Sequence, residues 1–149
     1  MAEIKSPKKF VVLTIILAAF FLNLLWEVSH SMLYDWDKAP LINNIYVYIP
    51  RILGASCLDA FFIFIIILLN SLLRRSFQWV HSPRKRDYMV LIILGVVAAI
   101  CIEWVATIFN MWSYNEFMPI IFGVGLTPLI QLAITGAFSL YVSTKIKWK

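Results

Sequence analysis

The sequence predicts an all-α fold: an integral membrane bundle of four transmembrane helices with the N- and C-termini in the cytoplasm. Of its 149 residues, 62% are hydrophobic and only 14% are charged, whereas a soluble domain is usually about half apolar and a quarter charged. Four apolar segments are each long enough to cross a hydrocarbon core, which needs about 20 residues. We therefore expect a single multi-pass domain, residues 1–149, in the cell (inner or plasma) membrane.

The first span, about residues 10–34, opens with FVVLTIILAAFFLNLLW after three lysines. A charged start followed by an apolar run is also typical of a secretory signal peptide. This run is too long for one, and no small-x-small cleavage site follows it. We interpret the segment as a retained membrane helix.

The second and third spans, about 49–73 and 88–112, enclose the basic loop SFQWVHSPRKRD. Eleven of the thirteen basic residues lie before the first span, in or beside this loop, or after the fourth span, which leaves Lys38 and Arg51 on the other side. Because cytoplasmic loops carry an excess of lysine and arginine, this loop and both termini are expected in the cytoplasm. The same distribution accounts for the net charge of +5 without a nucleic-acid partner.

The fourth span, about 119–143, begins irregularly as MPIIFGVGLTPLIQL. Pro119, Gly123, Gly125 and Pro128 fall within ten residues, which predicts a broken or late-starting helix. Non-helical backbone at membrane depth is tolerated only where protein buries it or where it lines a polar cavity.

Strongly polar residues fall at one depth of the predicted bundle. With a rise of about 1.5 Å per residue, Glu27 and His30 come late in an outward-running helix. Asp59 comes early in the inward-running second helix, and Glu103 comes late in the third. Gln131 follows the irregular entry of the fourth. All five are therefore expected in the outer half of the membrane.

Helical spacing also places these residues on common faces. Residues at i, i+4, i+7 and i+11 form one stripe of a helix. Two such stripes are Asn23, Glu27, His30 and Tyr34 on the first span, and Glu103, Thr107, Asn110 and Tyr114 on the third. Stripes that meet at one depth predict a single polar pocket inside the bundle, and ionisable residues inside a membrane are functional-site hypotheses by default.

Polar residues in membranes can also simply join helices, through interhelical hydrogen bonds of about 0.6–2 kcal/mol each. For Asn23 or Gln131 alone this is the simpler interpretation, and both are kept as candidate ligand-binding residues. Three carboxylates and an imidazole exceed what adhesion requires. The candidate catalytic residues are therefore Glu27, Asp59, Glu103 and His30. The other candidate ligand-binding residues are Trp26, Trp104, Asn110, Trp112 and Tyr114.

Three kinds of site are compatible with these residues. The first is an enzyme that acts on an apolar, isoprenoid-type or other lipid by isomerase- or cyclase-like acid–base chemistry. In it Glu27 and Glu103 would carry protons, Asp59 would assist them, and His30 would tune Glu27. The second is a non-enzymatic binder or carrier of a lipid or small molecule, or a subunit of a membrane complex. The third holds a metal through His30 and the carboxylates; otherwise no cofactor is expected. Faces that contain glycine and alanine also allow a homo-oligomer.

Four stretches of the chain resemble a family of small bacterial four-span membrane proteins of unassigned function. NLLWEVSHSMLY, SCLDAFFI, IEWVATIFNMWSYNEFMP and GVGLTPLIQL are similar to its motifs NLxWExxQxPLY, CxxGD, EWxN with WxYSxxMPxLP, and GTGLSPLLQW. The chain differs at His30, where glutamine is usual, at Leu58, where glycine precedes the aspartate, and at Val124, which replaces threonine. The acids of the motif are matched, at Glu27, Asp59 and Glu103. The resemblance implies a functional role for these acids more than for the histidine.

Two weaker likenesses point to substrate chemistry. NMWSYNE and TPLIQ are similar to the W-x-(Y/F)-N turn and the Pro-Leu-Glu-Glu of the lycopene-cyclase membrane domain, although Gln131 and Leu132 do not supply those acids. The polar site also resembles that of sterol-isomerase-type bundles. Both likenesses imply isoprenoid-like substrates and acid–base chemistry on a double bond.

Overall fold

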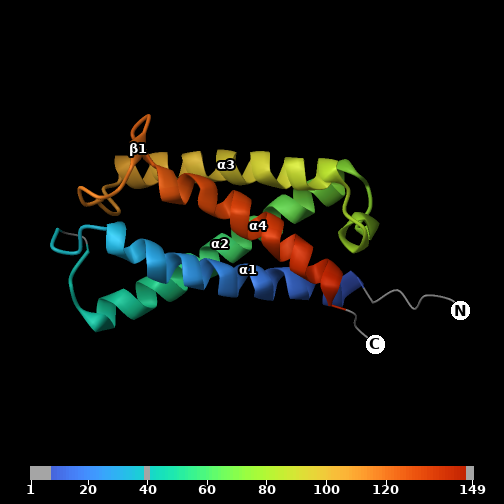
Figure 1. Cartoon of the computed structure of the whole chain (residues 1–149), viewed down its shortest axis with the longest axis horizontal. Helices are drawn as coiled ribbons and strands as arrows, with labels where there is room; N and C mark the ends of the chain where they lie inside the picture. Colours follow the sequence, from blue (N-terminus) through green and yellow to red (C-terminus); the bar gives the residue numbers. More distant parts are fainter. Residues whose placement is uncertain (1–7, 39–40, 147–149) are drawn as a thin grey trace, which may run out of the picture.

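Four long helices make up most of the computed structural model, which describes residues 8–38 and 41–146 (Figure 1). They are α1 (Lys8–His30), α2 (Ile45–Leu73), α3 (Lys85–Ile108) and α4 (Leu126–Lys145). The short elements are the 3-10 turns η1 (Ser31–Leu33) and η2 (Gln78–His81) and the strands β1 (Ile120–Ile121) and β2 (Val124–Gly125). All four long helices have the length and hydropathy of membrane spans, so the prediction of a four-helix, multi-pass architecture is confirmed at that level.

The helices alternate in direction. The start of α1 and the end of α4 lie at the same end of the bundle as the connection between α2 and α3 (Figure 1). The segments between α1 and α2 and between α3 and α4 lie at the other end, which we call the hairpin end because it carries β1 and β2. Helix α1 packs against α2 and α4, and α3 packs mainly against α4. Helices α2 and α3 diverge toward the hairpin end.

Small residues let α3 and α4 approach closely. A Cβ atom on Gly95 would lie 2.8 Å from the backbone nitrogen of Ala133, closer than real Cβ atoms come to such an atom. Around this contact, Leu91, Leu132 and Ile63 are almost fully buried. The core therefore sits in the middle of the bundle, and the divergence of α2 and α3 occurs beyond it.

Helices α2, α3 and α4 have different limits from the spans expected from hydropathy. Helix α2 begins at Ile45, where the side chain of Asn44 accepts a hydrogen bond from the Tyr46 N–H and caps the helix. Helix α3 ends at Ile108 rather than near residue 112, because Asn110 adopts a left-handed conformation with φ of 49°. Hydropathy does not register either a cap or a left-handed residue, so the apolar run extends past the true end of α3.

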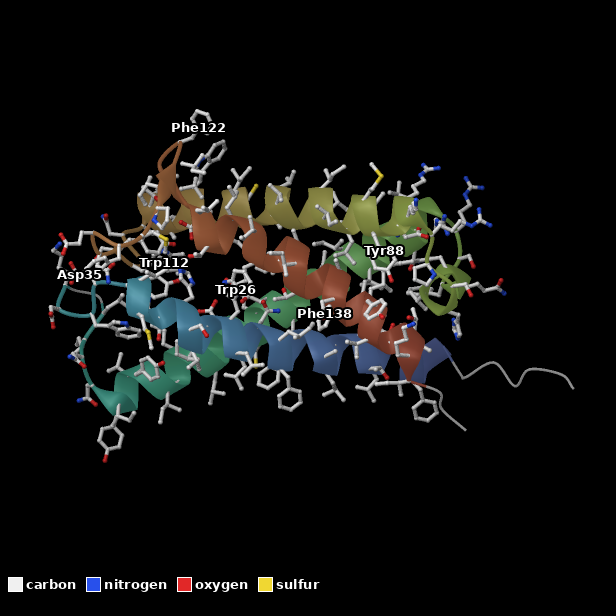
Figure 2. The ribbon with its side chains drawn as sticks, viewed as in Figure 1. Trp26, Asp35, Tyr88, Trp112, Phe122 and Phe138 are labelled. Atoms are coloured by element: carbon white, nitrogen blue, oxygen red, sulfur yellow. The ribbon has the colours of Figure 1, made fainter. Side chains whose placement is uncertain are left out.

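The late start of the fourth span was predicted correctly. Strands β1 and β2 form a small antiparallel hairpin before α4 begins at Leu126. Its two turn residues, Phe122 and Gly123, both have positive φ (51° and 79°), as a type I′ turn requires. Phe122 is 99% exposed, and its ring points away from the bundle in Figure 2.

Backbone hydrogen bonds join the two loops of the hairpin end. The Asp35 N–H donates to the Ser113 carbonyl at 2.9 Å, and the Asn115 N–H donates to the Leu33 carbonyl at 3.0 Å. Between them, Tyr34 and Tyr114 form an isolated antiparallel bridge. These bonds fix both tyrosines over the end of the bundle.

A separate polar cluster lies at the opposite end. Asp87 is fully buried and forms an ion pair with Arg74 at 3.0 Å. It also accepts hydrogen bonds from the Asn70 side chain at 3.4 Å and from the Arg84 N–H at 2.8 Å. Asn70 thus belongs to a cluster at the start of α3, away from the cavity-forming acids.

Candidate functional site

A cavity of about 400 Å³ lies at the hairpin end and receives side chains from all four helices. Most of its lining is apolar, with contributions such as Leu58, Ile102 and Leu132. Its charged and amide-bearing lining residues are Glu27, Arg51, Asp59, Glu103 and Gln131. Three acids from three different helices therefore meet at one apolar cavity, as the sequence predicted from their depth and faces.

Gln131 joins two of these acids. Its side-chain nitrogen lies 2.7 Å from Glu27 Oε1 and 2.7 Å from Asp59 Oδ2. An amide NH₂ has two hydrogens, so these two short contacts use both of them. The opposite orientation of the amide would turn its oxygen toward two other oxygens, which fixes the nitrogen toward the acids. Glu27 on α1 and Asp59 on α2 are thus neighbours across one amide group from α4.

Asn23 and Thr135 support this arrangement from behind. Asn23 is fully buried, and its Nδ2 donates to the Ala19 carbonyl one turn earlier at 2.9 Å. Its Oδ1 accepts from the Thr135 hydroxyl at 3.0 Å and lies 3.2 Å from the Gln131 nitrogen. Asn23 does not line the cavity; it holds α1 against α4 where Gln131 projects.

The third acid, Glu103, belongs to a chain of hydrogen bonds that runs from the loop. The Trp112 indole N–H donates to the Tyr114 hydroxyl at 3.0 Å, and that hydroxyl donates to Glu103 Oε1 at 2.7 Å. Because the hydroxyl oxygen already accepts from the indole, its own hydrogen is directed at the carboxylate. Such chains polarise one another, so Glu103 is held as a hydrogen-bond acceptor at the cavity wall. Figure 2 shows Trp112 at the hairpin end.

Tyr34 covers the same region from the other loop. Its ring stacks on that of Tyr114, with centroids 5.3 Å apart and planes 18° from parallel. It also lines the cavity. Burial raises the pKa of the Tyr34 hydroxyl well above its ordinary value, and the acids Glu27, Glu103 and Asp59 raise this pKa further. The pKa of Tyr114 is raised too, chiefly by burial. Both phenols are therefore neutral hydrogen-bond donors at physiological pH.

Helix α2 presents two adjacent stripes to the cavity. Arg51, Ala55 and Asp59 follow one another at intervals of four residues and all line it, so they share one face of the helix. Pro50, Gly54 and Leu58 form the next stripe around the helix; they line the cavity as well and are exposed. The cavity thus opens at the surface of the bundle along α2.

Two candidate residues lie at a different surface. His30 and Trp26 line a mostly apolar groove of about 460 Å³ between α1 and α4. Among the residues that the structure describes, neither the ring nitrogens of His30 nor the Trp26 indole nitrogen has a hydrogen-bond partner. The His30 ring packs 4.7 Å from the Tyr34 ring. His30 was expected to tune Glu27, but no hydrogen bond joins the two side chains; the hydrogen-bond partner of Glu27 is Gln131.

Two further candidates lie outside the cavity. Trp104 is 60% exposed on the surface of α3, where it directly follows the buried Glu103. Neighbouring residues point about 100° apart around a helix, so they cannot share a face. Asn110 is exposed beyond the end of α3. The expected stripe on the third span stops with the helix, and Tyr114 reaches Glu103 through the loop instead.

For a metal, the structure offers no ready ligand set: within residues 8–38 and 41–146, no three His, Cys, Asp or Glu side chains gather closely enough to hold one. Glu27 and Asp59 instead accept from the Gln131 amide, and Glu103 accepts from the Tyr114 hydroxyl. The carboxyl groups are therefore held by hydrogen bonds from neighbouring side chains.

Sequence reasoning gave no role to Arg51, Gly54 or Ala55, which all line the cavity. A signal for Arg51 was present, because it is one of two basic residues outside the three basic clusters. It also lies eight residues before Asp59, which is two helical turns along the same face.

No protein-family model, curated protein or solved structure matches this chain.

Proposed function

We propose that the chain is a membrane-embedded enzyme that binds an apolar, lipid-type molecule in this cavity and moves a proton on it. The observation that carries the proposal is the pair of carboxyl groups, Glu27 and Asp59, each 2.7 Å from one amide nitrogen at the wall of a mostly apolar cavity. Burial of several acids is costly in a membrane, and helix adhesion needs far less.

The proposed orientation places both termini and the 74–84 connection in the cytoplasm, as the distribution of basic residues favours. The hairpin end then faces outward, and the cavity lies in the outer half of the membrane. Its exposed stripe on α2 faces hydrocarbon, so a molecule dissolved in the bilayer can enter without crossing water.

The Glu27–Asp59 pair supplies the proton. Two carboxyl groups that accept from one amide repel each other when both are charged, so one proton on the pair is favoured and the pair titrates as a coupled unit. Gln131 donates one N–H to each side chain, which leaves the second oxygen of each carboxyl free to hold that proton. The pair is therefore equipped to give a proton to an electron-rich carbon such as that of a double bond.

Glu103 is the proposed acceptor. Its Oε1 takes the hydrogen bond from Tyr114. A carboxylate has about four acceptor sites, so Glu103 keeps the capacity to remove a proton from the carbon beside the cation that forms. One proton enters and one leaves, so the double bond moves without any oxidant or reductant. Return of that proton through water at the hairpin end reprotonates the Glu27–Asp59 pair.

A non-enzymatic binder is the second candidate, because a specific feature favours it. The carboxylates already have internal hydrogen-bond partners in Gln131 and Tyr114, and a satisfied network can serve only to shape a site. In that case the bound molecule would leave chemically unaltered.

Proton exchange distinguishes the two candidates. Purified protein in neutral detergent is incubated in D₂O buffer with isoprenoid alcohols and a total membrane lipid extract, which are then analysed by mass spectrometry. The enzyme proposal predicts deuterium on carbon in at least one isoprenoid or other lipid with wild-type protein. It also predicts at least about a hundredfold less with Glu27→Gln or Asp59→Asn, the usual scale of acid–base catalysis.

The matched control is Glu116→Gln, which removes an exposed acid at the same end of the bundle and should incorporate deuterium like wild type. Size-exclusion profiles and thermal melts establish that each variant is folded. Retained lipid without deuterium on carbon would favour the binder. Equal deuterium in wild type and Glu27→Gln would remove the proposed proton donor.

A further inference from the structure

Among the residues that the structure describes, Arg51 is the one basic residue that lines the cavity. Its guanidinium donates to the Met111 carbonyl just beyond α3, so it bridges the two helices that diverge at this end. That bond uses one of the five N–H donors of the side chain. The remaining donors and the positive charge have no counterpart in the proposed proton transfer.

No carboxylate pairs with Arg51 among the residues that the structure describes. The ion pairs found there are Lys38–Asp35 and Arg74–Asp87. The side chain of Lys38, the other basic residue expected on this side, is 71% exposed, and its Nζ lies 2.7 Å from Asp35 Oδ2. Arg51 is half-buried, and an unpaired cation in such a place attracts an anionic ligand.

The position of Arg51 along α2 gives the ligand a direction. Arg51 and Asp59 share one face of the helix and are eight residues apart, which corresponds to about 12 Å. Between them Ala55 presents only a methyl group, and a Cβ atom on Gly54 would meet nothing within 4 Å. A narrow track thus runs along α2 from a cation near the loops to the acids deeper in the bundle.

We infer that the cavity takes a lipid with an anionic head group, a phosphate or a carboxylate, which Arg51 binds while the apolar chain lies along α2 toward Asp59. The guanidinium fork matches both head groups in a bidentate geometry. The chain then passes Gly54 and Ala55, and its unsaturated carbons reach the Glu27–Asp59 pair. This inference rests on the proposed use of the cavity for an apolar molecule, and it narrows that molecule to an anionic amphiphile.

Three probes with the same chain test the head group: farnesyl phosphate, farnesoic acid and farnesol. Binding to the full chain in neutral detergent is followed by tryptophan fluorescence, because Trp36 and Trp112 line the cavity. We expect at least one of the two anionic probes to bind about tenfold or more tightly than farnesol, as a charge-assisted bond predicts. Inorganic phosphate at equal concentration should displace neither.

The variants isolate the charge. Arg51→Gln keeps a hydrogen-bond donor but removes the cation, and it should bring all three probes to within about threefold of one another while farnesol binding is unchanged. Lys38→Gln removes the other cation of this end and should preserve the preference. Arg51→Lys, which keeps a point charge without the fork, should keep part of it.

The inference is overturned if farnesol binds as tightly as both anions, if none of the probes binds, or if the preference survives in Arg51→Gln. Displacement by inorganic phosphate as effective as by farnesyl phosphate would identify a site for free anions and would equally contradict a lipid. The proposed function is tested separately. Deuterium on a neutral lipid, with unchanged activity in Arg51→Gln, would support the proposed enzyme and contradict the anionic head group. Binding of an anionic probe that depends on Arg51, without deuterium on carbon, would support the anionic head group and contradict the proposed enzyme.

Discussion

The Tyr114 hydroxyl lies 2.7 Å from Glu103 Oε1 although the tyrosine is on a loop and the glutamate is inside a helix. Helix α3 ends at Ile108, and the chain then folds back so that Tyr114 meets the acid from beyond the helix end. The same hydroxyl accepts from the Trp112 indole at 3.0 Å. The loop therefore completes the site, which no single helix could do alone.

Removing this hydroxyl should affect stability and reaction together. Tyr114→Phe removes the hydroxyl that donates to the Glu103 carboxylate and accepts from the Trp112 N–H, so we expect a loss of about 1.5–3 kcal/mol in unfolding free energy. Deuterium incorporation should fall at least about tenfold, because the acceptor is no longer oriented. Chemical unfolding in detergent measures the first effect. Tyr46→Phe, at a tyrosine that is 84% exposed, should change neither quantity.

Gln131 should be the most sensitive amide in the chain. Gln131→Leu leaves Glu27 and Asp59 without the N–H donors that they share, and unsatisfied buried acceptors cost about 1–3 kcal/mol each. We expect a loss of roughly 2–6 kcal/mol in unfolding free energy. The matched change Gln78→Leu, at an exposed glutamine, should cost less than about 0.5 kcal/mol. A small effect at Gln131 would mean that the bridge is not formed.

The close approach of α3 and α4 predicts opposite results at two glycines. Gly95→Ala places a methyl group 2.8 Å from the Ala133 backbone, where neither helix can yield, and should cost about 1–3 kcal/mol. Gly54→Ala meets nothing within 4 Å and gains helix propensity, so it should be neutral or stabilising by up to about 1 kcal/mol. Thermal melting in detergent compares them. Equal destabilisation at both positions would contradict the packing of α3 on α4.

Tyr34 and Tyr114, two half-buried tyrosines of the hairpin end, should respond to high pH. The folded state raises the pKa of Tyr34 and Tyr114, so it holds these protons more tightly than the unfolded chain does. Their contribution to stability is fully present below the ordinary tyrosine pKa of about 10 and is lost as pH rises above it. The loss should be about 1.4 kcal/mol per pH unit for each residue.

Absorbance at 295 nm checks this prediction, because it counts ionised phenols. Of the six tyrosines, Tyr34 and Tyr114 should ionise only as the protein unfolds, because the folded state raises the pKa of both. The variant Tyr34→Phe should remove one late-titrating group. If Tyr34 and Tyr114 ionised together with the other four tyrosines in the folded protein, the described packing of the hairpin end would be incorrect.

The meeting of the three acids was predictable because depth and helical face are properties of the sequence. The depth of Glu27, Asp59 and Glu103 follows from their position along helices of regular rise, and antiparallel packing brings them to one level. Gln131 was expected in the same pocket for the same reason. What the pattern does not contain is which hydrogen bond each group makes, since that depends on how far each helix is rotated.

The errors about partners follow from that limit. His30 was expected to tune Glu27, since residues three apart are neighbours on a helix. Helix α1 ends at His30, and the His30 ring packs against the Tyr34 ring instead. Trp104 was expected in the pocket through its position beside Glu103, although adjacency in a helix separates two side chains. The left-handed Asn110, which ends the stripe on α3, leaves no trace in hydropathy.

Native mass spectrometry of protein purified in neutral detergent shows most directly whether an apolar molecule occupies the cavity beside the Glu27–Asp59 pair. Ala55→Trp fills the track between Arg51 and Asp59, whereas Cys57→Trp adds the same ring to an exposed position of α2 outside the cavity. We expect a bound lipid-sized mass in wild type and in Cys57→Trp, and its loss in folded Ala55→Trp. Retention of the same mass in Ala55→Trp, or no bound mass in wild type, would contradict it.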